Sequence, residues 1–222
     1  MKSLLVFFSF LFLSITSATA QETTSLYAVE LTGTFSSFEQ QIKTEIGGIK
    51  GELLTSDAEL SLQLLGTYKV WKFISVGWYL QYDSGNREIA QFSGFDAQGA
   101  AEVINLQGGA YSELWTGPLI RAHYKQAFFE LAYGLVGNRN DDARNDLFNE
   151  SGSNEGTLTV DPSVAWLLGF GVDVALHNKL SLLLKAQYRV RYYDSRDGEK
   201  LQNESVHGTQ NFSPMIGLRY QL

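Results

Sequence analysis

The sequence contains no cysteine, and only three of its 222 residues are proline. Without cysteine the chain forms no disulfide framework, and no cysteine follows the N-terminal segment to carry a lipid. Long apolar runs are also missing after residue 20, where none approaches the ~18 residues that a membrane-spanning helix needs. The fold therefore has to depend on hydrogen bonding and packing.

Positive charge is scarce as well. The chain has 17 Lys+Arg against 24 Asp+Glu, which gives a formal net charge of −7. Surfaces that bind nucleic acid are built from clustered lysine and arginine, and this balance of charge does not favour them. We therefore expect no nucleic-acid partner.

The first twenty residues have the organisation of a secretory signal peptide. Lys2 supplies the charged start, residues 4–13 form an apolar run interrupted only by Ser9, and Ala18-Thr19-Ala20 is a small-x-small cleavage site. The apolar run is too short to span a bilayer, which favours a cleaved signal over an uncleaved N-terminal anchor. We predict a signal peptide over 1–20 and a single domain over 21–222.

The chain is rich in glycine, with 21 residues, and in aromatic residues, at 13%. The stretch "LSLLLKAQYRVRYYD" (180–194) shows the main pattern, because apolar and polar residues alternate along it. A period of two is typical of a β-strand, whose successive side chains point to opposite faces. One face of this strand is apolar, and the other carries Lys185, Arg189 and Arg191.

The same alternation recurs along the chain and predicts eight strands. Short turns join the second strand to the third, the fourth to the fifth and the sixth to the seventh, whereas the other connections are long. This is an antiparallel up-and-down meander with unlike ends. Around Gly117-Pro118 the phase is confused, and we expect a bulge there because proline cannot donate to the ladder. The predicted strands are 25–36, 57–69, 72–83, 112–124, 127–138, 162–176, 180–194 and 210–222.

Two kinds of eight-stranded barrel fit these strands. A soluble lipocalin-like barrel keeps its apolar residues inside, whereas a membrane barrel turns them toward lipid. Strands of about 12 residues favour the membrane barrel, because a tilted strand needs 9–11 to cross a bilayer. Aromatic residues near both strand ends also favour it, since aromatic girdles mark the two membrane interfaces. The predicted girdles are Tyr27, Tyr68, Trp71, Tyr124 and Tyr220 toward the short turns, and Tyr82, Trp115, Trp166 and Tyr192 toward the long loops.

The signal peptide, the eight amphipathic strands and the terminal strand "NFSPMIGLRYQL" (211–222) together resemble a small outer-membrane β-barrel of a Gram-negative bacterium. The "SPxxGLxY" pattern is similar to outer-membrane β-barrel domain proteins of the Bacteroidota. The resemblance implies short periplasmic turns, long extracellular loops and integral location in the cell outer membrane. It also implies contact with outer-membrane lipid or lipopolysaccharide, and with the barrel-assembly machinery. Leu222 departs from the phenylalanine that more often ends such proteins.

The polar face of each strand would point into a lumen that eight strands leave just wide enough for side chains to fill. Buried charges have to be paired. Five acids and five cations share this face, which predicts a structural ion-pair network. A narrow small-solute channel is the alternative, and it requires unpaired charges. The predicted network consists of Glu30, Glu59, Glu113, Glu130 and Asp173 with Arg121, Lys185, Arg189, Arg191 and Arg219.

Enzymatic activity and a cofactor are not expected. Some outer-membrane barrels are lipid A deacylases, which resemble serine hydrolases with a histidine, a serine two residues on and an acid. Of the three histidines only His207 is at the outer end of a predicted strand, and Gly208-Thr209 follows it. A lipid-modifying enzyme is the alternative, and it requires a base and an acid in contact with a hydroxyl near His207.

The long connections suggest a protein that displays loops outside the cell. The acidic stretch 138–156 offers oxygen ligands, but Ala143 stands where a calcium loop of the EF-hand type needs glycine, so we expect no metal site. Residues 40–54 alternate around Gly47-Gly48 and predict a hairpin that continues the first two strands, and 101–107 extends the fourth. We predict a non-enzymatic structural, adhesive or complex-subunit scaffold whose extracellular loops meet a possible protein partner.

Overall fold

The computed structural model describes residues 26–46, 49–95, 99–106, 109–141, 156–160, 165–200 and 208–222. The predicted signal peptide, most of the acidic stretch 138–156 and His207 lie outside these residues. In the described part of the chain, no helix has the length and apolar character needed to cross a membrane.

The described residues form one antiparallel sheet of twelve strands. Each long strand alternates between apolar and polar residues, so each has one face suited to an apolar environment and one suited to hydrogen bonding. The strands are β1 (Tyr27–Ile46), β2 (Ile49–Trp71), β3 (Ile74–Phe95), β4 (Ala101–Leu106), β5 (Ala110–Tyr124), β6 (Ala127–Tyr133), β7 (Val136–Asp141), β8 (Gly156–Val160), β9 (Trp166–His177), β10 (Leu180–Arg196), β11 (Glu199–Lys200) and β12 (Gly208–Gln221).

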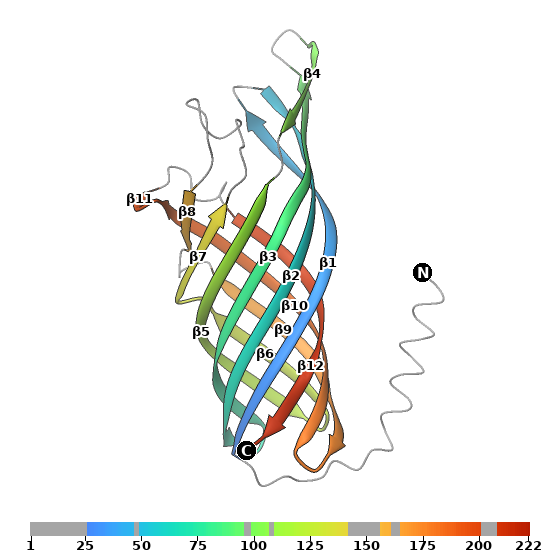
Figure 1. Cartoon of the computed structure of the whole chain (residues 1–222), viewed down its shortest axis with the longest axis vertical. Coiled ribbons are helices and arrows are strands. Elements are labelled where there is room, and N and C mark those ends of the chain that lie inside the picture. The colour runs from blue at the N-terminus through green and yellow to red at the C-terminus, as the bar shows by residue number, and fades with distance from the viewer. Residues whose placement is uncertain are drawn as a thin grey trace, which may run out of the picture.

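The strands close into a ring of eight paths (Figure 1). β6 and β7 share one path and β8 and β9 share another, so the order around the ring is β1, β2, β3, β5, β6–β7, β8–β9, β10 and β12. Pairing of β12 with β1 closes it over six residue pairs, from Ala28–Gln221 to Gly33–Ile216. The predicted all-β antiparallel barrel of eight strands is therefore confirmed. Short turns lie at one end of the barrel, here called the turn end, and the opposite end is called the loop end.

The faces of the barrel are inverted relative to those of a soluble protein. Along β2, Leu60, Leu62 and Leu64 are 42–47% exposed, whereas Ser61 and Gln63 between them are at most 1% exposed. The other strands follow the same rule, and large apolar side chains cover the outside of the ring. Burying polar groups while exposing leucine is unfavourable in water. The arrangement is that of a barrel whose surroundings are hydrocarbon.

The bulge predicted at Gly117-Pro118 lies on the neighbouring strand path instead. β5 runs through both residues with an unbroken register against β3. On its other side, Gly117 and Pro118 face the three residues Tyr133 to Leu135, because the register of β5 with β6 differs by one from that with β7. The extra residue reverses the parity, so inward positions are even-numbered in β6 and odd-numbered in β7. A Cβ at Gly117 would lie 1.8 Å from the Tyr133 carbonyl oxygen, which only glycine avoids.

Four strands continue beyond the ring at the loop end. β1 and β2 pair without interruption to Ile46 and Ile49, which confirms the predicted hairpin. β4 pairs with β3 along the same edge that β5 uses lower down, as predicted for 101–107. β4, β3, β2 and β1 thus form a four-stranded sheet that stands above the rest of the barrel in Figure 1. One extra residue in β3, between Arg87 and Ile89, produces a bulge near its base.

Candidate functional site

The barrel interior holds a large group of buried charged side chains. All ten residues of the predicted network point into it. Eight of them are at most 4% exposed, and the side chains of Asp173 and Arg219 near the turn end are 17% and 13% exposed. The alternation of side chains along each strand is enough to place them there, because each occupies an inward position.

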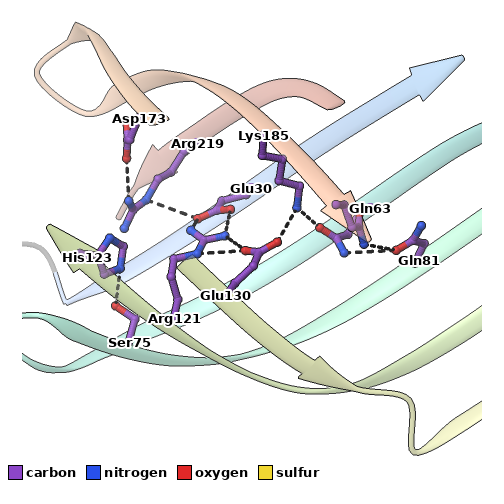
Figure 2. A network of polar contacts seen from close by, with 11 residues as sticks. Glu30, Gln63, Ser75, Gln81, Arg121, His123, Glu130, Asp173, Lys185 and Arg219 are labelled. Atoms are coloured by element: carbon purple, nitrogen blue, oxygen red, sulfur yellow. Dashed lines mark hydrogen bonds and ion pairs between the residues drawn. The ribbon is translucent and has the colours of Figure 1, made fainter. Parts of the chain in front are cut away.

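Arg121 is the centre of a turn-end cluster made of Glu30, Glu130, Asp173, Arg121, Lys185 and Arg219 (Figure 2). Its Nη2 lies 2.7 Å from Glu30 Oε2 and 2.6 Å from Glu130 Oε2, its Nε lies 3.1 Å from the latter oxygen, and its Nη1 also binds Glu30. The guanidinium carbon lies 4.3 Å from the centre of the Phe128 ring. One planar cation thus holds two carboxylates that come from opposite parts of the wall.

Lys185 and Arg219 complete the charge balance of the turn-end cluster. Lys185 Nζ lies 3.0 Å from Glu130 Oε1, and Arg219 Nη1 lies 2.7 Å from Asp173 Oδ2. Arg219 Nε also lies 3.5 Å from Glu30 Oε1. Three carboxylates therefore meet three cations, and the cluster is formally neutral.

A loop-end cluster consists of Glu59, Asp83, Glu113, Arg189 and Arg191. Asp83 Oδ2 lies 2.7 Å from Arg189 Nη1 and 2.7 Å from Arg191 Nη2. Arg189 also pairs with Glu59, and Arg191 with Glu113. Two tyrosines donate to the remaining carboxylate oxygens at 3.0 Å: Tyr111 to Glu59 and Tyr193 to Glu113. The arginine pair and the phenol donors together compensate three buried acids.

A layer of amides joins the two clusters. Gln81 Oε1 accepts from Gln187 at 3.0 Å and from Gln63 at 3.3 Å, while Gln81 Nε2 donates to Asp83 at 3.0 Å. Gln63 in turn accepts from Lys185 (Figure 2). At this height the interior is also packed with an apolar cluster: Leu65, Tyr79, Trp115, Leu119, Ala132 and Leu167. Side chains thus occupy the interior from one charged cluster to the other.

One predicted girdle residue is wrong. Trp115 lies inside the barrel and is 0% exposed, with its ring 5.1 Å from that of Tyr79 and 4.0 Å below the Arg191 guanidinium. The cause is the phase of β5, which runs unbroken through Pro118 and turns odd-numbered residues inward. The other eight predicted girdle residues lie on outward positions: Tyr27, Tyr68, Trp71, Tyr124 and Tyr220 near the turn end, and Tyr82, Trp166 and Tyr192 nearer the loop end.

The sequence reasoning missed Asp83, which holds both arginines of the loop-end cluster. It also missed the three glutamines of the amide layer. The signal was present, since Asp83 shares its parity with Gln81 and is the last residue of the predicted strand 72–83. Arg139 was missed because the predicted strand ended at residue 138. In the structure β7 continues to Asp141, and the extra residue between β6 and β7 puts Arg139 at an inward position, with its guanidinium carbon 3.9 Å from the centre of the Tyr111 ring.

The described histidines, His123 and His177, lie at the turn end, opposite to the end at which the enzyme alternative places its base. His123 Nε2 and Ser75 Oγ are 3.1 Å apart, and the nearby Asp173 is bound to Arg219 (Figure 2). His207, on which the enzyme alternative depends, lies outside the described residues. Among the residues described, no group of three or more acids and histidines is placed to hold a metal ion.

Replacing Gly169 tests how tightly the turn-end cluster is packed. A Cβ at Gly169 would lie 2.5 Å from Glu130 Cγ, and Glu130 cannot move aside because Arg121 and Lys185 hold it. We expect Gly169→Ala to lower the free energy of unfolding by about 1–3 kcal/mol, measured by urea titration in vesicles. Gly66→Ala is the matched control, because nothing lies within 4 Å of its Cβ. Equal effects of the two changes would contradict the packing described.

No protein-family model and no curated protein matches this sequence. Solved structures similar to it include the outer membrane protein OprG from Pseudomonas aeruginosa, at 12% identity and a TM-score of 0.38 over 88% of this chain and 95% of that one. Another is the translocator domain of the autotransporter NalP from Neisseria meningitidis, at 13% identity and a TM-score of 0.35 over 94% and 92%. What the chain does has to follow from its own residues.

Proposed function

We propose that this chain is a non-enzymatic, integral outer-membrane β-barrel of a Gram-negative bacterium that anchors an extracellular β-sheet and loops. The observation that carries the proposal is the inversion of its faces. Leucine and aromatic side chains cover the outside of the ring, and buried ion pairs fill the inside. Such a molecule is stable where hydrocarbon surrounds it, and strands cross a membrane only as a closed barrel.

The aromatic side chains support a membrane position with the turn end on one side. Trp71 and Tyr124 at the turn end are 74% and 71% exposed, and the centres of the Tyr27 and Tyr68 rings lie 4.9 Å apart at the same end. Near the loop end, the Trp166 and Tyr188 rings lie 5.6 Å apart. Aromatic rings with a polar edge favour the headgroup level, so two tiers delimit a band that lipid or lipopolysaccharide would surround.

The filled interior supports an anchor rather than a channel. Arg121, Arg189 and Arg191 each bind two carboxylates, and the amides between them are buried. Ion transfer would have to break these pairs in a low dielectric, which is costly. The part that rises above the band is the sheet of β1 to β4, which favours display to a protein partner. The short turns would then be periplasmic, and the barrel-assembly machinery would insert the barrel.

Heat-modifiability tests the proposal. We expect the protein purified in mild detergent to run faster on an SDS gel before boiling than after it, because a closed barrel resists SDS. The same material in planar bilayers is expected to give no conductance steps. A protein that stays monomeric in water without detergent would overturn the membrane location. Discrete conductance steps would favour the channel instead.

A further inference from the structure

The wall of the barrel is incompletely paired at the seam between its first and last strands. Along the described residues of both strands, β1 pairs with β12 only from Ala28–Gln221 to Gly33–Ile216. Both strands continue beyond that point, β1 on β2 and β12 on β10. Continued in the same register, Thr34–Phe38 would face Asn211–Met215, but no pairing joins these two segments. Here they are called the open seam.

Pro214 explains where the pairing stops. Leu222 N donates to the Tyr27 carbonyl, so even-numbered residues of β12 and odd-numbered residues of β1 direct their backbone groups toward each other. Phe35 and Pro214 would form the next such pair after Gly33 and Ile216. Proline has no N–H to donate, so this pair loses one of its two hydrogen bonds.

Two buried hydroxyls beside the open seam lack the partner that continued pairing would give them. Ser36 and Ser213 would be direct neighbours across the seam if the register continued, and paired hydroxyls at such positions bond to each other. Instead the Oγ atoms of both are buried and without a hydrogen-bond partner. Ser213 is 1% exposed as a residue.

The open seam begins within the apolar band. Phe35 and Phe212 flank it on the outside and are 73% and 58% exposed, and Ile216 just below is 58% exposed. Backbone groups that lack a partner at this depth cannot turn to water, so an open strand edge facing lipid is strongly unfavourable. A partner that offers backbone donors and acceptors would therefore stabilise the open seam.

We propose that a second copy of this chain occupies the open seam. This inference rests on the proposed membrane location. A two-fold axis along the barrel axis would place β1 of one copy beside β12 of the other and the reverse, with both copies in the same orientation in the membrane. Both contacts are antiparallel, because β1 and β12 run in opposite directions. A single foreign strand inserted here would be parallel to one of its two neighbours.

The interface would extend a pairing that this sequence already makes. Below the seam β1 and β12 of one chain pair with each other, and above it the same two strands would pair between chains. Pro214 still contributes no donor there, but Ser37 and Phe212 form the next pair with all their backbone groups available. The exposed rings of Phe35 and Phe212 would be covered by the second copy.

Cysteine cross-linking tests the proposal, since the natural chain has no cysteine. Ser37→Cys and Phe212→Cys, expressed as separate chains and reconstituted together in phospholipid vesicles, are expected to give a covalent heterodimer on oxidation. Adding Pro214→Ala to both should reduce that product several-fold, because the restored donor favours closure within one chain. Phe129→Cys, exposed on β6 across the ring, reports random collision. Dimer yields equal to that of Phe129→Cys would overturn the proposal.

Two double variants separate the possible failures. Leu31→Cys with Leu218→Cys in one chain, an outward pair in the closed part of the wall, is expected to cross-link within the monomer. Its failure would contradict the barrel itself and with it the proposed function. Ser37→Cys with Phe212→Cys in one chain is expected to link two copies. A cross-link within the monomer there would show that the seam closes on itself and would overturn only the dimer.

Discussion

Arg121→Leu is expected to lower the free energy of unfolding by about 3–5 kcal/mol, the cost of breaking a buried ion pair by removing one partner. Arg121 is 0% exposed and is the shared partner of Glu30 and Glu130. Leucine fills part of the space but leaves two carboxylates facing each other without their common cation. Lys185 and Arg219 remain on either side, yet each holds only one edge of the cluster.

Urea titration in phospholipid vesicles, followed by tryptophan fluorescence, measures this loss. Lys179→Ala at the exposed turn is the control and should change stability by no more than ~0.5 kcal/mol. Arg121→Leu combined with Glu30→Gln should recover most of the loss, because Glu130 keeps Lys185, Asp173 keeps Arg219, and the cluster is again neutral. A single Arg121→Leu variant as stable as Lys179→Ala would show that the interior charges are hydrated rather than paired.

Leu64→Arg is expected to cost about 2–4 kcal/mol of stability in a bilayer, the range for arginine on the lipid face near the midplane. Leu64 points outward from β2 in the middle of the apolar band and is 47% exposed. The physical reason is that the guanidinium would have to leave water for hydrocarbon. If this same barrel stood in water instead, the change would lie on the solvated surface and be close to neutral.

Val70→Arg is the matched control, because Val70 is on the same strand but near the turn end, at 52% exposure. Arginine at the interface is expected to cost about 0–1 kcal/mol. Comparing the free energies of unfolding of the two variants in vesicles separates the effect of membrane depth from the effect of the added charge. Equal costs would contradict the proposed position of the bilayer.

Much of the barrel could be predicted from the alternation of residues alone. Parity assigned Lys185, Arg189 and Arg191 to one face, and the strand length with the two tiers of aromatic residues predicted that the apolar face would meet lipid. The exception is Trp115, which was assigned outward because the proline at 118 suggested a break in its own strand. The structure has the extra residue in the adjacent path, where the small residue Gly134 offers no clear signal.

The individual ion-pair partners could not be predicted. Alternation tells which face of the sheet a side chain lies on, but not its level along the barrel axis. Glu30 on β1 meets Arg121 on β5 across the ring, and that contact depends on the tilt and stagger of all strands together. Asp83 shows the same limit. Its inward parity could be read from the sequence, but not that it would hold both arginines of the loop-end cluster.

The length of β2 has a mechanical consequence. Its 23 residues span roughly 75 Å at about 3.3 Å per residue, whereas crossing a bilayer uses only 9–11 of them. β1 and β2 run from the turn end to the tip of the sheet as continuous strands. A load applied at the tip would reach the barrel wall as shear along backbone hydrogen bonds, which resist it collectively. The sheet would therefore act as a stiff lever rather than a tether.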